Sequence, residues 1–168
     1  MLAAALDRPP VLLRLDLPAD VKAMLASDRV VRAGDQPAVV AGAVARAQAL
    51  HFPTVPGADG HARQAQAWFD PPGLPGLVPR AGEQRPLMVL LHGGPTSHIA
   101  HRTSHAGPAY STKVQFRTTR GYAVVDANHG ASSGYGRAYC ERLRGQWGVV
   151  DLQDAVAAVD HLVASGWG

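Results

Sequence analysis

The fold is decided by the stretch Leu87-Met-Val-Leu-Leu-His-Gly-Gly-Pro95, in which a short apolar run ends abruptly in a glycine-rich tetrapeptide. A continuous apolar run of this length predicts a strand of a parallel sheet that is buried on both faces. The tetrapeptide His92-Gly-Gly-Pro95 then stands at the carboxyl end of that strand, which is the edge where α/β proteins place their sites. We therefore predict chemistry at this end of strand 87–91.

The residues after this stretch predict a crossover to a second parallel strand. Pro108 to Arg120 is suited to a helix closed by Gly121, and Tyr122-Ala-Val-Val-Asp-Ala127 reads as another buried strand. A strand, a helix and a strand in succession imply a right-handed crossover and a parallel sheet. The glycine-rich loop Asn128 to Gly136 follows the second strand.

A second helix is predicted near the end of the sequence. Asp151 and Asp154 are placed in its first turn, where negative charge suits the helix dipole, and Ser165-Gly166 ends it. Its apolar residues recur with the helical period at Leu152, Ala155, Val156, Val159, Leu162 and Val163.

The residues before strand 87–91 predict an antiparallel pair and a less regular beginning. Ala49 to Phe52 and Ala62 to Phe69 flank the turn-rich segment Gly57 to Gly60, which favours a hairpin. Among the first 50 residues, the sequence predicts a strand in Val11 to Leu17, a short helix in Ala19 to Ser27, a turn in Arg32 to Pro37, and a helix by propensity in the alanine-rich Val39 to Leu50.

The composition is that of one globular domain. Hydrophobic residues make up 46% and charged residues 17% of 168 residues, too few charges for a disordered chain. Sixteen Lys and Arg against thirteen Asp and Glu are scattered, so no nucleic-acid partner is indicated. No apolar run approaches the roughly 20 residues of a membrane span, and no signal peptide is apparent at the start. With Cys140 as the single cysteine, we expect a cytoplasmic protein without a disulfide.

The two glycines of the tetrapeptide suit the stabilisation of an oxyanion. Without side chains, the backbone N–H groups of Gly93 and Gly94 can approach a substrate closely, and in α/β-hydrolases a loop after the third strand donates one such N–H to the tetrahedral intermediate. The alternative is a plain Gly-Gly turn before a proline.

Four motifs together resemble the prolyl oligopeptidase family, in its acylaminoacyl-peptidase and dipeptidyl-peptidase branch. They are Pro86 to Thr96, Arg120 to Asn128, Gly130 to Arg137, and Gly145 to Asp151, in order and with natural spacing. The resemblance covers about residue 49 to the end. It implies an α/β-hydrolase fold, here truncated after the fourth strand and its helix. It also implies the domains 1–48, a remnant of a β-propeller and linker, and 49–168, the N-terminal part of the peptidase domain.

The resemblance also implies roles for the residues that are present. Gly94, with Gly93 beside it, is the expected oxyanion donor, and the expected site-lining residues are His92, Pro95, Asn128 and Tyr135. His129 stands where the family is expected to have a tyrosine, which puts any contact of that hydroxyl in doubt. Gly145, Trp147, Gly148 and Asp151 look like the family's structural signature, with packing and capping roles.

The resemblance places the nucleophile on a Gly-x-Ser-x-Gly turn beyond Gly168, with the acid and the histidine later still. None of the three is expected in this chain, so it is expected to be inactive alone. Gly130-Ala-Ser-Ser-Gly134 fits the same pattern around Ser132, but three residues separate it from the preceding strand, whereas a nucleophile elbow joins strand directly to helix. Asp160 and His161 are adjacent on a helix and cannot act in series on one serine. We interpret Ser132 as a loop residue.

Two other groups of residues carry no predicted chemistry. His98, His101 and His105 have spacings that zinc can use, but no Cys, Asp or Glu nearby completes a site, and the resemblance implies no metal or other cofactor. Asp151 and Asp154 are explained as helix charges rather than as an acid and a base.

The function predicted from the resemblance is a serine peptidase that hydrolyses short peptides or acyl-peptides by acyl transfer. The alternatives are a carboxylesterase with a similar oxyanion loop, and a non-catalytic fragment or pseudo-enzyme that only binds partners. The sequence does not set the oligomeric state. Because strand 87–91 is expected to lack one neighbour, we expect an apolar edge that is prone to aggregation.

Overall fold

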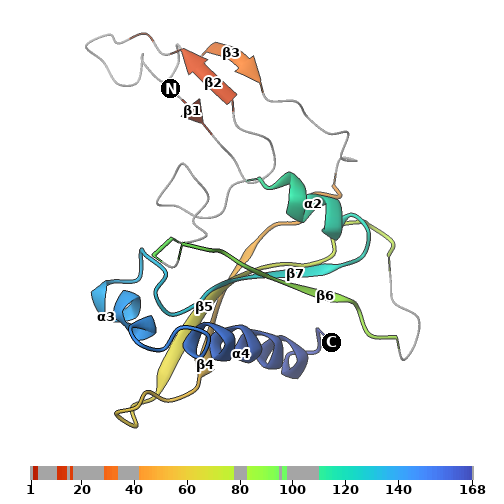
Figure 1. Ribbon diagram of the computed structural model, residues 1–168. Helices are drawn as coiled ribbons and strands as arrows, with labels where there is room; N and C mark the ends of the chain where they lie inside the picture. The colour runs from red at the N-terminus through yellow and green to blue at the C-terminus, as the bar shows by residue number, and fades with distance from the viewer. Residues whose placement is uncertain are drawn as a thin grey trace.

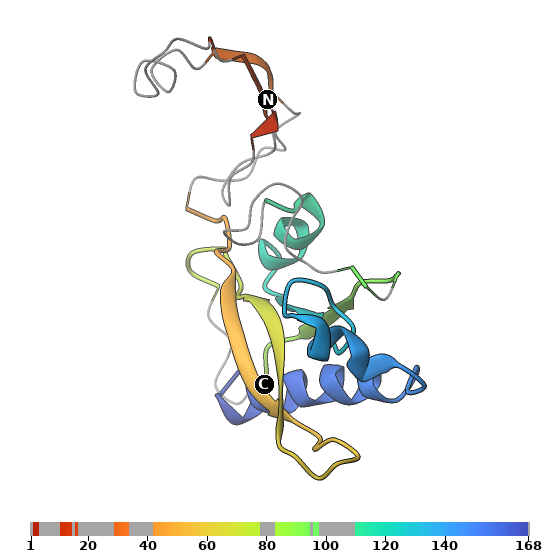
Figure 2. The same ribbon diagram turned by 90° about the vertical axis from the view of Figure 1, so that its left-hand side faces the viewer.

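The computed structural model describes residues 2–3, 11–14, 16, 29–33, 42–77, 83–94, 96–97 and 110–167. Near the N-terminus, β1 (Leu2–Ala3), β2 (Val11–Arg14) and β3 (Arg29–Ala33) form a three-stranded antiparallel sheet. Both views show this sheet standing away from the rest of the molecule (Figures 1 and 2). The strand expected in Val11 to Leu17 is confirmed as far as Arg14, β3 was not predicted, and the helix expected in Ala19 to Ser27 lies outside the described residues.

The main sheet has four strands in the order β4-β5-β7-β6. The hairpin of β4 (Gln48–Thr54) and β5 (Arg63–Asp70) is antiparallel, as predicted, and β5 pairs antiparallel with β7 (Ala123–Asn128). The edge strand β6 (Leu87–Leu91) runs parallel to β7, which confirms the predicted parallel pair. The sheet therefore brings the carboxyl ends of β6 and β7 together.

The helix predicted by propensity for Val39 to Leu50 is wrong in its described part. Residues 43–47 have no regular structure, and Gln48 already belongs to β4. The reason is tertiary: β4 pairs along its whole length with β5 and buries Phe52 completely, which outweighs the helix propensity of alanine.

Helices flank the sheet above and below in Figure 1. α2 (Thr112–Thr118) connects β6 to β7; the Ser111 side chain caps it by accepting from the Val114 N–H. Gly121, with φ of +88°, follows this helix as predicted, although the helix is shorter than Pro108 to Arg120. After β7 come α3 (Arg137–Cys140) and the 3-10 turn η1 (Glu141–Leu143), which the sequence did not predict, and then α4 (Val150–Ala164).

The core lies between α4 and one face of the sheet. Its buried members are Phe52, Ala65, Ala67, Phe69, Ala123, Val125, Ala127, Ala158 and Leu162. All six residues of β7 are buried, as expected of a central strand. No residue of β6 is fully buried, so the prediction of burial on both faces is wrong for this strand, because β6 is an edge strand with β7 on one side only within the described chain.

The predicted helical period of α4 is confirmed only in part as a buried stripe. Ala155 and Leu162 are buried, but Leu152, Val156 and Val163 are exposed. Trp147, expected to pack, has 66% of its surface exposed. Within the described residues, no helix is both long and apolar enough to cross a membrane.

Candidate functional site

The Gly-Gly loop leaves β6 at its carboxyl end and presents unengaged amides. Gly93 and Gly94 are exposed, and Gly94 has a φ of +78°, a left-handed conformation that favours glycine. Within the described part of the chain, neither glycine N–H donates a hydrogen bond, whereas the Gly94 carbonyl accepts from Thr96 Oγ1 at 3.4 Å. A backbone N–H that is not used within its own loop can donate to an oxyanion. Pro95, also expected to line the site, lies outside the described residues.

His92, the first residue of this loop, is held by the loop that follows β7. Its ring stacks on that of His129, with centroids 4.6 Å apart and planes at 20°. Its Nε2 lies 2.8 Å from Ser132 Oγ, and that hydroxyl donates to the His129 carbonyl at 2.7 Å. Because a carbonyl can only accept, the hydroxyl hydrogen is committed there, so His92 Nε2–H donates to Ser132 Oγ. The Ser133 N–H also donates a hydrogen bond of 2.9 Å to the Ser97 carbonyl, which is a second connection between the two loops.

The geometry around Ser132 favours a structural role over a nucleophilic one. A serine hydroxyl 2.8 Å from an imidazole is the spacing of a nucleophile and its base. However, Ser132 has none of its surface exposed and its hydroxyl donates to a carbonyl. The strained residue of this turn is Ala131, with φ of +92°, rather than the serine. His161, the other candidate histidine, stacks on Phe52 of β4.

This interpretation predicts that the 168-residue chain resists serine-reactive probes. Incubation with a fluorescent fluorophosphonate is expected to leave the chain unlabelled on a denaturing gel, because the probe cannot reach the buried Ser132 hydroxyl. The Ser132→Ala variant serves as the control. Labelling of the wild-type chain that disappears in this variant would make Ser132 the nucleophile.

The loop after β7 is fixed by a network around Asn128. Asn128 is fully buried. Its side-chain Nδ2 donates to Tyr135 Oη at 2.8 Å, and its backbone carbonyl accepts from Tyr139 Oη at 2.6 Å. Burial raises the pKa of both tyrosines above the usual value, which keeps the hydroxyls protonated. Asn128 thus fixes the backbone of the loop that follows β7, while Tyr135 remains exposed. That Asn128 and Tyr135 line a substrate site stays a prediction.

Asp154 was predicted as a charge in the first turn of the last helix, and this placement is wrong. It lies beyond the first turn of α4 and is buried, with 3% of its surface exposed. Its Oδ2 accepts the Gly130 N–H at 2.7 Å, and its Oδ1 accepts the Thr54 hydroxyl at 2.6 Å. The available signal was that this aspartate falls between apolar positions on the buried side of the helix, where a charged residue needs partners.

Gly130 and Ala131 show how tightly this loop is packed. A Cβ on Gly130 would lie 2.7 Å from Val150 Cγ1, so only glycine fits there. Ala131 is buried and carries a positive φ that costs a non-glycine residue about 1–3 kcal/mol.

Ala131→Gly is expected to raise the free energy of unfolding by about 1 kcal/mol. Relief of the positive φ exceeds the loss of one buried methyl group, worth about 0.8 kcal/mol. Urea denaturation followed by circular dichroism would measure the change. As a control, Ala157→Gly, in the middle of α4, should destabilise by about 1 kcal/mol; destabilisation in both variants would show that Ala131 is not strained.

Two further buried carboxyls lie on the sheet face opposite α4. Strand register places Asp126 opposite Trp68 and Asp70 opposite Val124, so both aspartates project from the same face. Burial raises the pKa of Asp70 to about 7, helped by the charge of Asp126. Burial raises the pKa of Asp126 to about 6, although Lys113 opposes this. The sequence analysis did not single out either residue.

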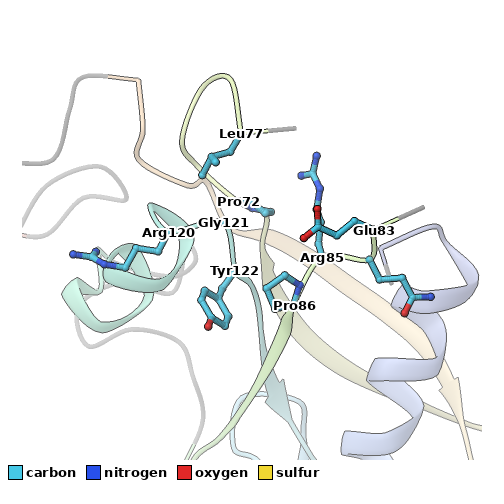
Figure 3. Close-up of a pocket in the computed structure, with 9 residues that line it drawn as sticks. Pro72, Leu77, Glu83, Arg85, Pro86, Arg120, Gly121 and Tyr122 are labelled. Carbon is cyan, nitrogen blue, oxygen red and sulfur yellow. The ribbon is translucent and has the colours of Figure 1, made fainter. Parts of the chain in front are cut away.

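A hollow of about 330 Å³ lies at the other end of the parallel strands from the Gly-Gly loop. Figure 3 shows Pro86 and Tyr122, which precede β6 and β7, at its centre, with Glu83 and Arg85 on one side and Arg120 on the other. It therefore lies at the amino ends of the parallel strands, away from the candidate site. The described residues contain no group of three or more metal-ligating side chains, and His98, His101 and His105 lie outside them.

The mixed sheet and its flanking helices define an α/β protein. Its candidate site lies where loops meet at the carboxyl ends of the two parallel strands. A family model described as the prolyl oligopeptidase family matches residues 108–168. Together with the relatives below, this match confirms the predicted resemblance to that family.

Curated and solved proteins agree with this assignment. The uncharacterized peptidase YuxL of Bacillus subtilis (strain 168) is 36% identical over 78 residues, which is 46% of this chain and 11% of that protein. Acylamino-acid-releasing enzyme 1 of Oryza sativa subsp. japonica is 33% identical over 82 residues, 49% of this chain and 10% of that enzyme. The chain thus spans about a tenth of the length of these relatives.

The structural similarity extends over nearly the whole chain. A puromycin-hydrolyzing peptidase of Mycobacterium tuberculosis has a TM-score of 0.78 and 33% identity, covering 98% of this chain and 23% of the peptidase. A puromycin hydrolase has a TM-score of 0.75 and 34% identity, covering 99% of this chain and 22% of that enzyme. An acylaminoacyl peptidase of Pyrococcus horikoshii, with a TM-score of 0.62 and 20% identity, shares the fold.

Proposed function

We propose that the chain is the first part of the catalytic α/β-hydrolase domain of a serine peptidase. In this proposal Gly94, with Gly93 beside it, donates a backbone N–H to the oxyanion of the tetrahedral intermediate. The nucleophile, the acid and the catalytic histidine would lie in sequence beyond Gly168, and the 168 residues alone would be inactive.

The observation that carries this proposal is that the Gly-Gly loop is exposed, has two N–H groups that are unused among the described residues, and is held in place at His92. Gly93 and Gly94 are exposed at the carboxyl end of a parallel strand, and neither N–H donates a hydrogen bond within the described chain. The loop's first residue is fixed by a stack on His129 and a hydrogen bond to Ser132. A preorganised donor costs no reorganisation when charge develops, which is the physical requirement for stabilising an oxyanion.

We propose short peptides or acyl-peptides as substrates. The support is the names of similar proteins, which include acylamino-acid-releasing enzymes, a dipeptidyl aminopeptidase and puromycin hydrolases. We further propose residues 1–48 as a remnant of a β-propeller and linker, and 49–168 as the start of the peptidase domain. The N-terminal sheet standing apart from the main sheet supports this division (Figure 2). A cytoplasmic location is proposed from the single Cys140.

The proposal is tested on the protein encoded when the reading frame is followed past codon 168. We expect a Gly-x-Ser-x-Gly sequence soon after, and hydrolysis of acyl-peptide substrates in preference to simple esters. In that protein, Gly94→Ala should lower kcat by roughly 10²–10³-fold, because a side chain at this φ displaces the loop and its amide.

Gly76→Ala provides the matched control. Gly76 also has a positive φ, +86°, and its Cβ would meet nothing within 4 Å, but it lies in the loop after β5. Its substitution should leave kcat unchanged. An equal loss in both variants would mean that backbone strain alone lowers kcat, and an unchanged kcat for Gly94→Ala would remove the oxyanion role.

A further inference from the structure

The Gly-Gly loop is attached at both of its ends to the turn that follows β7. At the start of the loop, His92 Nε2 lies 2.8 Å from Ser132 Oγ. Beyond the two glycines, the Ser97 carbonyl accepts a hydrogen bond of 2.9 Å from the Ser133 N–H. Both ends of the loop are therefore held by two consecutive residues, Ser132 and Ser133, which we call the serine clamp.

Between these two attachments, the proposed oxyanion donors have little support of their own. Apart from its chain neighbours, a Cβ built on Gly93 or Gly94 would meet none of the described atoms within 4 Å. A glycine also has more backbone freedom than any other residue, and Gly94 uses it with a φ of +78°. The direction of the Gly94 N–H therefore depends on how firmly the two ends of the loop are held.

The turn that carries the serine clamp is itself firmly held. Ser132 is completely buried, and its N–H donates to the His129 carbonyl at 2.9 Å. The neighbouring Ala131 N–H donates to the Tyr139 carbonyl at 3.0 Å, and the Cys140 thiol donates to the Ser132 carbonyl at 3.2 Å. The turn is thus anchored to α3, so the clamp is the fixed partner and the exposed loop is the part that it positions.

The Ser132 hydroxyl supplies a restraint on His92 that ring stacking alone does not give. The stack on His129 fixes the plane of the His92 ring, but stacking energy changes little when a ring turns within its own plane. A hydrogen bond depends strongly on distance and angle, so the bond from Nε2–H to Ser132 Oγ also fixes that rotation. Together the two contacts leave the His92 side chain one position.

The closure of its own turn does not account for both hydrogen bonds of this hydroxyl. A serine that only closes a turn needs the short-range bond to a backbone carbonyl, here the one of 2.7 Å to His129. The second bond joins Ser132 to His92, which lies 40 residues earlier in the chain and belongs to a different loop. The hydroxyl therefore connects a rigid turn to the entrance of the Gly-Gly loop.

We propose that Ser132 is a positioning residue for the oxyanion donors. Its hydroxyl, acting through the His92 imidazole, fixes the start of the Gly-Gly loop so that the Gly94 N–H points at the carbonyl being attacked. The inference rests on the proposed oxyanion role of this loop. Position matters because a displacement of about 1 Å at a reacting centre can cost roughly 100-fold in rate.

Kinetics of the protein encoded by the full reading frame, with an acyl-peptide substrate, test the inference. Ser132→Ala should lower kcat by roughly 10-fold, because the loop loses one of its restraints while the stack on His129 remains. KM should stay unchanged, since an oxyanion donor acts on the transition state and not on the bound substrate.

Thr118→Val is the matched control. It also removes a completely buried hydroxyl that donates to a backbone carbonyl, that of Gln115 at 3.3 Å, but it lies on α2. Its kcat should equal that of the wild type. Circular dichroism and thermal unfolding would establish that both variants are folded under the conditions of the assay.

A double-mutant cycle separates positioning through His92 from a purely structural role of Ser132. His92→Phe keeps a ring to stack on His129 but removes the Nε2–H donor, so it should lower kcat by a factor similar to that of Ser132→Ala. The double variant should be no slower than the slower single variant, because both changes break the same hydrogen bond. If Ser132 supported the site by another route, the two losses would multiply.

The outcomes distinguish this inference from the proposed function. A loss of kcat in Gly94→Ala together with wild-type kcat in Ser132→Ala would overturn the positioning role and leave the oxyanion role intact. An unchanged kcat in Gly94→Ala would remove the oxyanion role, and the inference with it. Losses that multiply in the double variant, or a raised KM with unchanged kcat in Ser132→Ala, would also overturn the inference.

Discussion

Asp154→Ala is expected to lower the free energy of unfolding by about 3–5 kcal/mol. The substitution removes the acceptor for the buried Gly130 N–H and for the partly buried Thr54 hydroxyl. Each donor left unsatisfied costs about 1–3 kcal/mol, and the packed loop leaves little room for water to replace the carboxyl. Urea denaturation at one fixed protein concentration would measure the loss.

Two variants control this experiment. Asp160→Ala changes an exposed aspartate on the same helix and should alter stability by less than about 0.5 kcal/mol. Asp154→Asn retains one oxygen acceptor, and the Thr54 hydroxyl can turn to accept from the amide, so its cost should be smaller than that of alanine. Equal effects of Asp154→Ala and Asp160→Ala would mean that the buried network does not stabilise the fold.

The stability of the chain is expected to fall as pH rises from about 4 to 8, by on the order of 3 kcal/mol. Burial raises the pKa of Asp70 from 3.8 to about 7 and that of Asp126 from 3.8 to about 6. A pKa that is higher in the folded state means that folding favours the protonated acid. The stabilisation is therefore complete below pH 4 and is lost as pH rises through 6 and 7.

Asp70→Asn should remove most of this dependence and stabilise the chain at pH 8, because the amide is neutral at every pH and fits the same space. Thermal unfolding at several pH values would show a flatter profile for this variant. Asp59→Asn changes an exposed loop carboxyl whose pKa is lowered by the His61 backbone, so it should leave the slope above pH 4 as in the wild type. An unchanged slope in Asp70→Asn would show that this carboxyl is ionised throughout.

The sequence predicted those parts of the fold whose signal is local. The apolar runs of β6 and β7, the turn between β4 and β5, and the period of α4 all lie within short windows. The abrupt change from Leu91 to His92-Gly-Gly also located the candidate site, because glycines directly after an apolar strand are typical of a loop that lets a substrate approach the backbone. The two strands, the hairpin and the helix are confirmed with boundaries shifted by a few residues, whereas the role of the candidate site stays a prediction.

What escaped prediction depends on partners far away in sequence. The alanine-rich segment before Leu50 becomes coil and strand because β5 is available to pair with it. Asp154 looked like a helix charge because its partners, Thr54 and Gly130, precede it by 100 and 24 residues. The composition of residues 87–91 predicted burial on both faces, and the unpaired side of β6 was expected only from the strand order that the resemblance implies.

The single carboxyl of Asp154 joins three segments that otherwise have separate tasks. Thr54 ends the first strand of the hairpin, Asp154 belongs to the helix beneath the sheet, and Gly130 adjoins the histidine on which His92 rests. The helix cannot slide or rotate without pulling on that glycine, and through the stacked rings on the entrance to the Gly-Gly loop. A displacement of the helix would thus be transmitted to the Gly-Gly loop, the proposed oxyanion donor, through only one hydrogen bond and one ring stack.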